Sequence, residues 1–181
     1  DVVWYIDGSA ISPTSPLITT LGFAVAVVAD NGDLLAFGAG VPPPFVLDSA
    51  GAEAWALKIA VSLCPAAPRV VTDCLSLRRV ASSGFGAATA ATAPQARIWH
   101  MMHECFDEPL HTLVANNQLD WMPAHRGVSD VGVKRLASGR RLTAIDWRAN
   151  RLVDFLARAA AASPLTAAGV AVAASARAAV S

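Results

Sequence analysis

Short apolar runs separated by polar breaks dominate the first forty residues, which is the pattern of strands joined by turns. Such runs cover residues 2–6, 21–28 and 34–37. The first run stops at Asp7, and Asn31-Gly32 lies between the second and third runs. Asn-Gly between two apolar runs is a strong hairpin signal, because both residues accept a positive φ. The pattern therefore predicts an antiparallel meander of three strands, with Asp7 at the end of the first.

An amphipathic helix is predicted after the three prolines that follow the meander. From residue 48 or 49 to about residue 64, apolar residues recur at intervals of three and four, as they do on one face of a helix. This stripe consists of Ala50, Ala54, Leu57, Val61 and Cys64. Glu53 lies beside this apolar stripe, where a carboxylate is unfavourable unless another group compensates its charge. A second interpretation makes Glu53 a first-turn residue that the helix dipole favours.

Two further short strands are predicted, and polar side chains follow each of them. Residues 69–73 are predicted as a short strand that ends on Asp73. The intervening helix predicts a parallel crossover, which brings Asp73 to the same end of the sheet as Asp7. Alternatively, Asp73 caps a short helix over residues 75–82. The fifth strand, over residues 119–122, leads to His125 at the opening of a loop, where side chains can reach a site.

The segments between these last strands predict a linker and a helix. Residues 84–94 are rich in Gly, Ala and Thr and have no period, so we expect a flexible linker. Residues 95–106 have a helical pattern. Two histidines of this helix, His100 and His103, share no row with a third metal ligand, and we interpret them as solvated or core side chains.

A final amphipathic helix is predicted before the Ala-rich end of the sequence. Thr143 or Asp146 is available as its N-cap. Asn150 and Asp154 are four residues apart on one row at the edge of its apolar stripe, so both can face the sheet.

The composition limits the class of protein. With 181 residues the chain is long enough for one domain with a substantial core, which we expect over residues 1–162, followed by a tail over residues 163–181. The three cysteines are widely spaced in apolar sequence, and we interpret them as reduced core residues. The sequence has no pattern of a signal peptide or a membrane span, so we expect a soluble, intracellular protein, cytoplasmic or nuclear.

Positive charge is concentrated in one window of a chain whose net charge is zero. Seven of the 14 lysine and arginine residues lie between residues 126 and 151. A neutral chain lacks the overall basic field of a typical nucleic-acid binder, so such a role would depend on this window. A solvated surface loop would have the same composition, but the window begins beside His125 and ends on the helix that carries Asp154. We therefore predict phosphate contacts for Arg126, Lys134, Arg135, Arg140 and Arg141.

Five short motifs, in this order, resemble the signatures of the ribonuclease H family. They are Tyr5-Ile6-Asp7-Gly8-Ser9, Ala52-Glu53-Ala54, Val71-Thr72-Asp73, the stretch 121–127, and the stretch 150–158 with the sequence NRLVDFLAR. The resemblance covers roughly residues 1–162 and is to type I domains, including those of retrotransposon polyproteins. It implies an α/β fold of the ribonuclease H type, with a mixed five-stranded sheet, three strands antiparallel and two parallel, flanked by helices.

The resemblance also implies an endonuclease that cleaves the RNA strand of RNA/DNA hybrids. Phosphodiester hydrolysis needs hydroxide at neutral pH and a neutralised transition state, which two divalent ions about 4 Å apart can supply. Carboxylate oxygens suit Mg²⁺, with Mn²⁺ as a substitute. By resemblance, Ser9 and Asn150 contact the substrate, and His125 assists proton transfer or product release. The implied metal ligands are Asp7, which would bridge both ions, Glu53, Asp73 and Asp154.

Departures from the family pattern leave other interpretations open. Ser49-Ala50 stands where relatives carry small amide side chains, and Cys74-Leu75 stands where a Ser-Gln pair is common, so strict hybrid recognition is not implied. Proofreading-type exonucleases and integrases place their acidic residues differently and fit less well. The alternative function is a non-catalytic nucleic-acid-binding or structural module of a larger polyprotein. We expect a monomer without membrane contacts, and the resemblance suggests a tether to a reverse transcriptase or to other domains.

Overall fold

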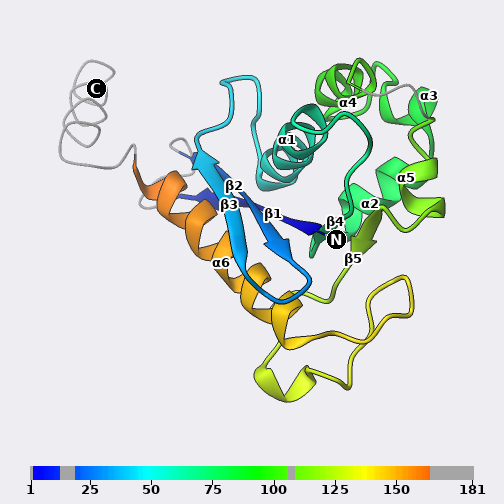
Figure 1. Ribbon diagram of the computed structural model, residues 1–181. Coiled ribbons are helices and arrows are strands. Elements are labelled where there is room, and N and C mark those ends of the chain that lie inside the picture. Colours follow the sequence, from blue (N-terminus) through cyan, green and yellow to red (C-terminus); the bar gives the residue numbers. More distant parts are fainter. Residues whose placement is uncertain (1, 13–18, 106–108, 164–181) are drawn as a thin grey trace, which may run out of the picture.

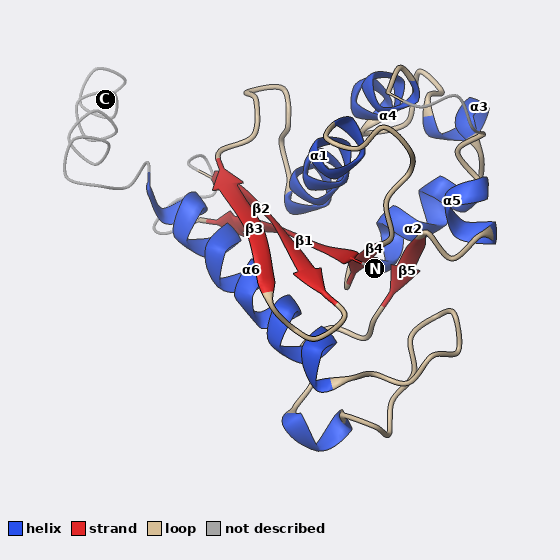
Figure 2. Cartoon of the chain, viewed as in Figure 1, coloured by secondary structure: helices blue, strands red, loops and turns tan. Residues whose placement is uncertain are grey.

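The sheet of the computed structural model contains five strands in the order β3-β2-β1-β4-β5 (Figure 1, Figure 2). The structure describes residues 2–12, 19–105 and 109–163. An antiparallel meander is formed by β1 (Val2–Ile11), β2 (Thr20–Ala29) and β3 (Leu34–Gly40). Two short strands extend the sheet in parallel with β1, namely β4 (Val70–Thr72) and β5 (Leu119–Trp121). The predicted mixed five-stranded sheet is therefore confirmed.

Helices cover both faces of this sheet (Figure 1). On one face α6 (Ala144–Ala162) packs against β1 and β2, and on the other α1 (Ser49–Ser62) packs against the same strands. Alternation along β1 sends Ile6 into the apolar cluster beneath α1 and Tyr5 into the cluster beneath α6. The remaining helices lie on the α1 side and around the parallel strands: α2 (Leu75–Ser82), α3 (Phe85–Ala88), α4 (Ala96–His103) and α5 (Thr112–Ala115).

The helix α1 is buried more widely than one amphipathic stripe would allow. Its N-cap is Asp48, whose carboxylate accepts a hydrogen bond of 2.6 Å from the backbone N–H of Gly51. Eight of its 14 residues are buried, because the helix lies between the sheet and α4. Ala52 and Ala56, which lie outside the predicted stripe, are fully buried. The predicted stripe is therefore too narrow, since small side chains let α1 approach two neighbours at once.

Two expectations for the middle of the chain are wrong in detail. The segment 84–94 is not simply a linker, because it contains α3, and Ala88 is fully packed against the core. Phe85 anchors this segment by ring contacts with His100 and His103, at centroid distances of 5.3 and 4.1 Å. The cysteines are free thiols, as predicted, but they are only partly buried and so do not belong to the fully buried core.

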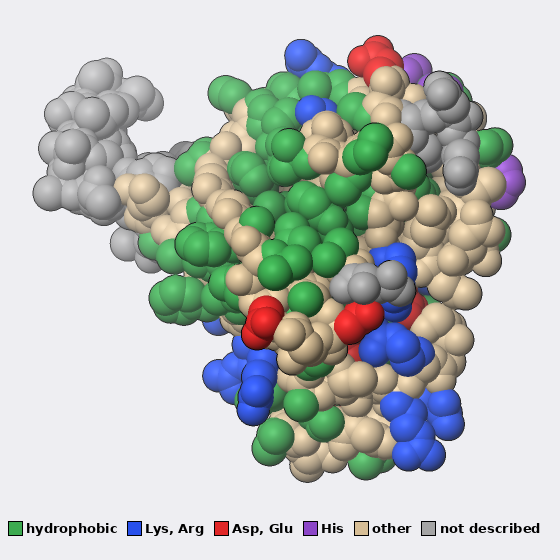
Figure 3. All heavy atoms as spheres, in the orientation of Figure 1, with side chains coloured by type: hydrophobic (Ala, Val, Ile, Leu, Met, Phe, Trp, Pro, Cys, Tyr) green, Lys and Arg blue, Asp and Glu red, His purple; other side chains and the backbone are tan. Residues whose placement is uncertain are grey.

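The segment between β5 and α6 folds back onto the domain instead of projecting freely. The backbone N–H of Ala137 donates to the carbonyl of Trp121 at 2.8 Å, and Arg135 pairs with Arg141 in an isolated β-bridge. The segment includes a short 3-10 helix, η1 (Val128–Asp130). We call residues 126–143 the basic loop. Lys and Arg side chains gather over it on the lower part of the face shown in Figure 3.

Most of the predicted tail lies outside the described residues. Of the predicted tail, residues 163–181, only Ser163 belongs to the described residues. Within the described ranges, none of the helices has the length and apolar character needed to cross a membrane.

Candidate metal centre

Three carboxylates from three different elements meet at one end of the sheet. Asp7 lies on β1, Glu53 on α1, and Asp73 directly after β4. One carboxylate oxygen from each residue lies within 4.8 Å of the others. The parallel pairing of β1 with β4, in which Tyr5 is opposite Val71, places Asp7 and Asp73 at the same end of neighbouring strands. The structure therefore brings together three of the four predicted metal ligands.

A glycine allows α1 to approach β1 closely enough for this cluster to form. A Cβ atom on Gly8 would lie 2.7 Å from the carbonyl carbon of Ala52 and 2.8 Å from the carbonyl oxygen of Ser49, and it would also clash with the backbone nitrogen of Glu53. Because backbone atoms of a helix cannot move aside as a flexible side chain can, only glycine fits at this position. The contact fixes Glu53 beside Asp7.

The structure excludes the helix-terminus interpretations of Glu53 and Asp73. Because α1 begins at Ser49, Glu53 is in the second turn, and the first turn contains no acidic residue. Thr72, which is completely buried, donates from Oγ1 to Oε2 of Glu53 at 3.2 Å. The N-cap of α2 is Cys74, and no side chain caps that helix. Neither Glu53 nor Asp73 has the helix-terminus role that would otherwise explain it.

Burial and mutual repulsion make the carboxyls of the cluster hard to ionise. Loss of hydration raises the pKa of Asp7 to about 6, with further raising by the charges of Asp73 and Asp154, although a hydrogen bond with Glu53 opposes the shift. Burial, followed by the charge of Asp7, raises the pKa of Glu53 well above its ordinary value. Burial also raises the pKa of Asp73, while the amide of Asn150 and the charge of His125 act in the opposite direction. The ionised carboxylates of the cluster therefore lack enough nearby positive charge to stabilise them.

The fourth predicted ligand, Asp154, lies at the margin of the cluster. It is half-buried, and its carboxylate forms an ion pair of 2.8 Å with Arg158, one turn further along α6. Its charge still acts on Asp7 and Asp73. Asn150, one turn earlier, is buried and donates from Nδ2 to Oδ2 of Asp73 at 3.3 Å. Of the two polar residues predicted on this row, Asn150 is thus the one that touches the cluster directly.

The predicted histidine stands at the entrance of the basic loop. His125 is exposed and has a positive φ of 51°, which is unusual for a residue with a side chain. Its charge lowers the pKa of Asp73, which places it within electrostatic reach of the cluster. Trp147 holds the following residue by donating from Nε1 to the carbonyl of Arg126 at 2.8 Å. The location agrees with a side chain that can approach the site from solvent.

The residues predicted to contact the substrate differ in their exposure and in their hydrogen bonds within the protein. Ser9 is partly buried on β1, two residues beyond Asp7. Three members of the basic set, Arg126, Lys134 and Arg141, are exposed, and so is Arg135, which donates to the carbonyl of Gly139. Arg140 differs, because both of its terminal nitrogens donate to Asp146, at 2.7 and 2.8 Å. Its guanidinium is therefore engaged within the protein.

Sequence reasoning missed two residues that support the cluster. Thr72 holds Glu53, and Trp121 donates from Nε1 to the backbone carbonyl of Asp73 at 2.9 Å. A hydroxyl side chain next to Asp73 in an otherwise apolar strand is a detectable signal for the first. The second had no local signal, because Trp121 and Asp73 are 48 residues apart.

The strand order, the parallel β4 and β5, and the helices on both faces define a ribonuclease H-like fold. Among solved structures, the solution structure of the PFV RNase H domain superposes with a TM-score of 0.57 and 18% identity, over 88% of this chain and 93% of that domain. RNase H1 from the halophilic archaeon Halobacterium salinarum superposes with a TM-score of 0.53 and 15% identity, over 88% of this chain and 96% of that one.

A longer protein contains the same fold. In prototype foamy virus protease-reverse transcriptase the TM-score is 0.58 at 18% identity over 88% of this chain, which spans only about one fifth, 20%, of that protein. No protein-family model matches the sequence, and no curated protein matches it. These structures confirm the ribonuclease H resemblance at the level of the fold.

Proposed function

We propose that this chain is a metal-dependent endonuclease that hydrolyses the RNA strand of RNA/DNA hybrids. The observation that carries the proposal is the meeting of Asp7, Glu53 and Asp73 at the end of a ribonuclease H-like sheet. Among the described residues, no lysine or arginine forms an ion pair with any of the three. Folding alone gains nothing from three mutually repelling carboxylates, so a bound cation is the simplest reason for the arrangement.

The donor set fits Mg²⁺ or Mn²⁺. Both ions prefer hard oxygen ligands, and Mg²⁺ in particular keeps waters and substrate phosphate oxygens in its shell. Asp7, Glu53 and Asp73 would hold the metal, with Asp154 joining when its ion pair with Arg158 opens. Bound metal would supply a water of lowered pKa and neutralise the negative charge of the phosphodiester transition state. Burial of Asp7 and Glu53 strengthens this role, because electrostatic interactions are stronger away from bulk water.

The neighbouring side chains have separate tasks in this proposal. Asn150 and Thr72 orient the carboxylates of Asp73 and Glu53 through the hydrogen bonds described above. The exposed imidazole of His125, whose charge acts on Asp73, would accept or deliver a proton as the product leaves.

Two observations support an RNA/DNA hybrid as the proposed substrate: the exposed positive charges of the basic loop and one structurally similar protein. One matched structure is of the foamy viral protease-reverse transcriptase in complex with an RNA/DNA hybrid. In the present chain, the exposed cations of the basic loop lie between His125 and the helix that carries Asn150. We propose that they contact phosphates of the hybrid, and that the domain works together with a reverse transcriptase.

A non-catalytic module is the second candidate, and one observation favours it. Asp154, the residue expected to complete the ligand set, is bound to Arg158 instead of facing the other three carboxylates. In that case the three remaining carboxylates would bind a cation without supporting hydrolysis.

Cleavage assays distinguish the two candidates. The protein is incubated with end-labelled RNA/DNA hybrid, double-stranded RNA and single strands, in Mg²⁺, Mn²⁺ or EDTA. The endonuclease proposal predicts internal cuts in the RNA of the hybrid, only with metal, and a metal-dependent rise in thermal stability. A thermal shift without any cleavage would support the non-catalytic module, and the absence of both would refute metal binding.

A further inference from the structure

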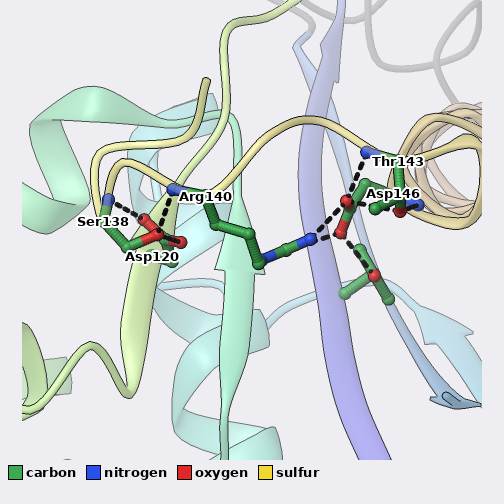
Figure 4. A network of polar contacts seen from close by, with 6 residues as sticks. Asp120, Ser138, Arg140, Thr143 and Asp146 are labelled. Carbon is green, nitrogen blue, oxygen red and sulfur yellow. Dashed lines mark hydrogen bonds and ion pairs between the residues drawn. The ribbon is translucent and has the colours of Figure 1, made fainter. Parts of the chain in front are cut away.

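Another buried carboxylate, Asp146, forms a polar network that the proposed reaction does not use (Figure 4). It is 1% exposed and receives five hydrogen bonds from three residues. The guanidinium of Arg140 donates twice, Thr143 donates from its backbone nitrogen at 2.8 Å and from Oγ1 at 2.6 Å, and Tyr5 donates from its hydroxyl at 2.8 Å. The Tyr5 bond joins residues 141 positions apart, on β1 and α6.

This network lies next to the metal centre along both elements. On β1, Tyr5 precedes Asp7 by two residues, so both side chains point to the same face of the sheet. On α6, Asp146, Asn150 and Asp154 follow one another at intervals of four, which places them on one side of the helix. The Tyr5–Asp146 bond therefore joins β1 and α6 about one helical turn before the position where Asn150 reaches Asp73.

A second contact holds α6 beyond the metal centre. A Cβ atom on Gly22, which pairs with Ser9 across the sheet, would collide with backbone atoms of Ala157 and Ala161 and lie 3.1 Å from the carbonyl carbon of Ala160. The helix thus touches the sheet backbone at this end. Asn150 and Asp154 lie between this contact and the Tyr5–Asp146 bond.

Directional contacts add to apolar packing in holding α6 on the sheet. The fully buried apolar side chains of α6 are small, namely Ala149, Val153, Ala157 and Ala161, and its larger side chains Ile145, Leu152 and Leu156 pack against the cluster while only partly buried. Burial is non-directional, whereas a hydrogen bond fixes both distance and direction.

We propose that Tyr5 and Asp146 are positioning residues that set the register of α6 on β1 and thereby hold Asn150 toward the metal centre. Arg140 keeps Asp146 ionised and bound, and it ties the basic loop to the same point. This inference rests on the proposed function for its catalytic meaning. The placement of Asn150 can be measured without any activity.

The test uses Tyr5→Phe, which removes one hydroxyl and leaves the Arg140–Asp146 pair intact. The side-chain amide signals of Asn150 are followed in proton–nitrogen correlation spectra of the full chain, and Asn150→Ala identifies them. We expect these signals to shift in Tyr5→Phe, and the affinity for Mn²⁺ to fall by about 3- to 10-fold, the range of one hydrogen bond. Leu113→Val in α5 is the control: it removes one buried methylene far from β1 and α6 and should leave both readouts unchanged.

A double-mutant cycle shows whether the effect passes through Asn150. If it does, Tyr5→Phe will weaken Mn²⁺ binding in the wild-type background and have little further effect in Asn150→Ala. Unchanged Asn150 amide signals in Tyr5→Phe would overturn the inference, and so would equal losses of affinity in both backgrounds. A wild-type protein that binds no Mn²⁺ would refute the proposed function instead, while the amide signals would still decide whether Tyr5 sets the register.

Discussion

The buried carboxylate Asp146 and the cluster formed by Asp7, Glu53 and Asp73 lie near each other, and the protein surrounds them in opposite ways. Asp146 is surrounded by donors, including a guanidinium, and although burial alone would raise its pKa, the hydrogen bonds from Arg140, Thr143 and Tyr5 outweigh burial and lower it. Asp7 and Glu53 have comparable burial, but their pKa values are raised. Asp146 is satisfied by the fold itself, whereas the cluster needs a cation or protons from outside.

The difference shows how a structural acid and a functional acid can be separated. Burial is common to both, so burial alone does not identify a site. The distinguishing property is whether protein donors neutralise the charge, since a neutralised carboxylate has no need of a ligand. By this criterion we propose the cluster as the functional site and Asp146 as part of the scaffold.

The largest expected effect is the loss of hydrolysis in Asp73→Asn. The amide keeps the shape of the side chain but removes the charge that a metal ion needs, so the rate should fall on the order of 10³-fold or more, about 4 kcal/mol of transition-state stabilisation. The free energy of unfolding without metal should stay the same or rise slightly, because repulsion among the carboxylates is relieved. Rates are measured on labelled hybrid in Mn²⁺, and metal-dependent cleavage by the purified variant at the wild-type rate would contradict the catalytic assignment.

Arg140→Ala should cause the largest loss of stability. It leaves the almost fully buried carboxylate of Asp146 without its cationic partner. A fully buried pair costs about 3–5 kcal/mol to break, but Arg140 is 35% exposed and Asp146 keeps its bonds from Tyr5 and Thr143, so we expect a loss of about 2–3 kcal/mol. Urea unfolding monitored by tryptophan fluorescence gives the free energy of unfolding. Lys134→Ala is the matched control from the same loop, and as an exposed residue it should change stability by roughly 0.5 kcal/mol at most. Equal effects of the two substitutions would show that the Arg140–Asp146 pair contributes nothing.

The stability of the metal-free protein should fall as the pH rises from about 4 to about 6. Between its ordinary pKa of 3.8 and its folded pKa of about 6, Asp7 binds more protons in the folded state than in the unfolded state, so raising the pH favours unfolding. The expected loss is on the order of 2–3 kcal/mol. Asp146 has a lowered pKa, so its own contribution is essentially complete above about pH 5 and opposes this trend only slightly below that.

Unfolding curves at several pH values in EDTA measure this slope. Asp7→Asn should flatten it, and saturating Mn²⁺ should do the same in the wild type, because bound metal favours the ionised carboxylates. A wild-type slope that persists unchanged in Asp7→Asn would assign the titration to another group.

The exposed cations of the basic loop should determine the salt dependence of substrate binding. Because Arg140 is engaged by Asp146, the appropriate variant replaces Lys134, Arg135 and Arg141 with alanine. If each contacts one phosphate, the slope of log affinity against log salt should flatten by about 2, at roughly 0.7–0.9 per contact. Saturated turnover should change little. An unchanged slope would mean that these side chains are merely solvated.

His125→Ala should have the smallest effect. The side chain is exposed and does not belong to the cluster of three carboxylates, so turnover should fall by about tenfold, equal to about 1.4 kcal/mol, while the affinity for Mn²⁺ stays the same. Single-turnover and steady-state rates together show whether the affected step is hydrolysis or product release. A complete loss of cleavage would place His125 among the indispensable groups.

The carboxylate cluster was predictable because rules of strand connectivity relate residues that are far apart in the sequence. A helix between two strands implies a parallel crossover, so Asp7 and Asp73 could be placed at the same sheet end before any coordinates existed. Glu53 was identified because a carboxylate on an inward-facing side of a helix is energetically unfavourable unless another group compensates its charge. The rotation of α6 was not predictable: Asn150 and Asp154 share a row, and only packing decides that Asn150 reaches Asp73 while Asp154 meets Arg158.

The network around Asp146 could not be predicted for a different reason. The pattern indicated Thr143 or Asp146 as an N-cap, and the structure shows both in a capping box, with Thr143 as the cap. The partners of Asp146 on the other side, Tyr5 and Arg140, come from a strand and from a loop whose path has no periodic signal. Contacts between distant, irregular segments leave little trace in a single sequence.

The contact at Gly8 fixes the backbone separation of two members of the carboxylate cluster. Since α1 rests on the backbone of β1 there, main-chain atoms set how far Asp7 and Glu53 stand apart, and only side-chain rotation can adjust the distance between their carboxylates. A methyl group at position 8 would have to move the helix away from the sheet, so the closeness of the two acids depends on a side chain that is absent.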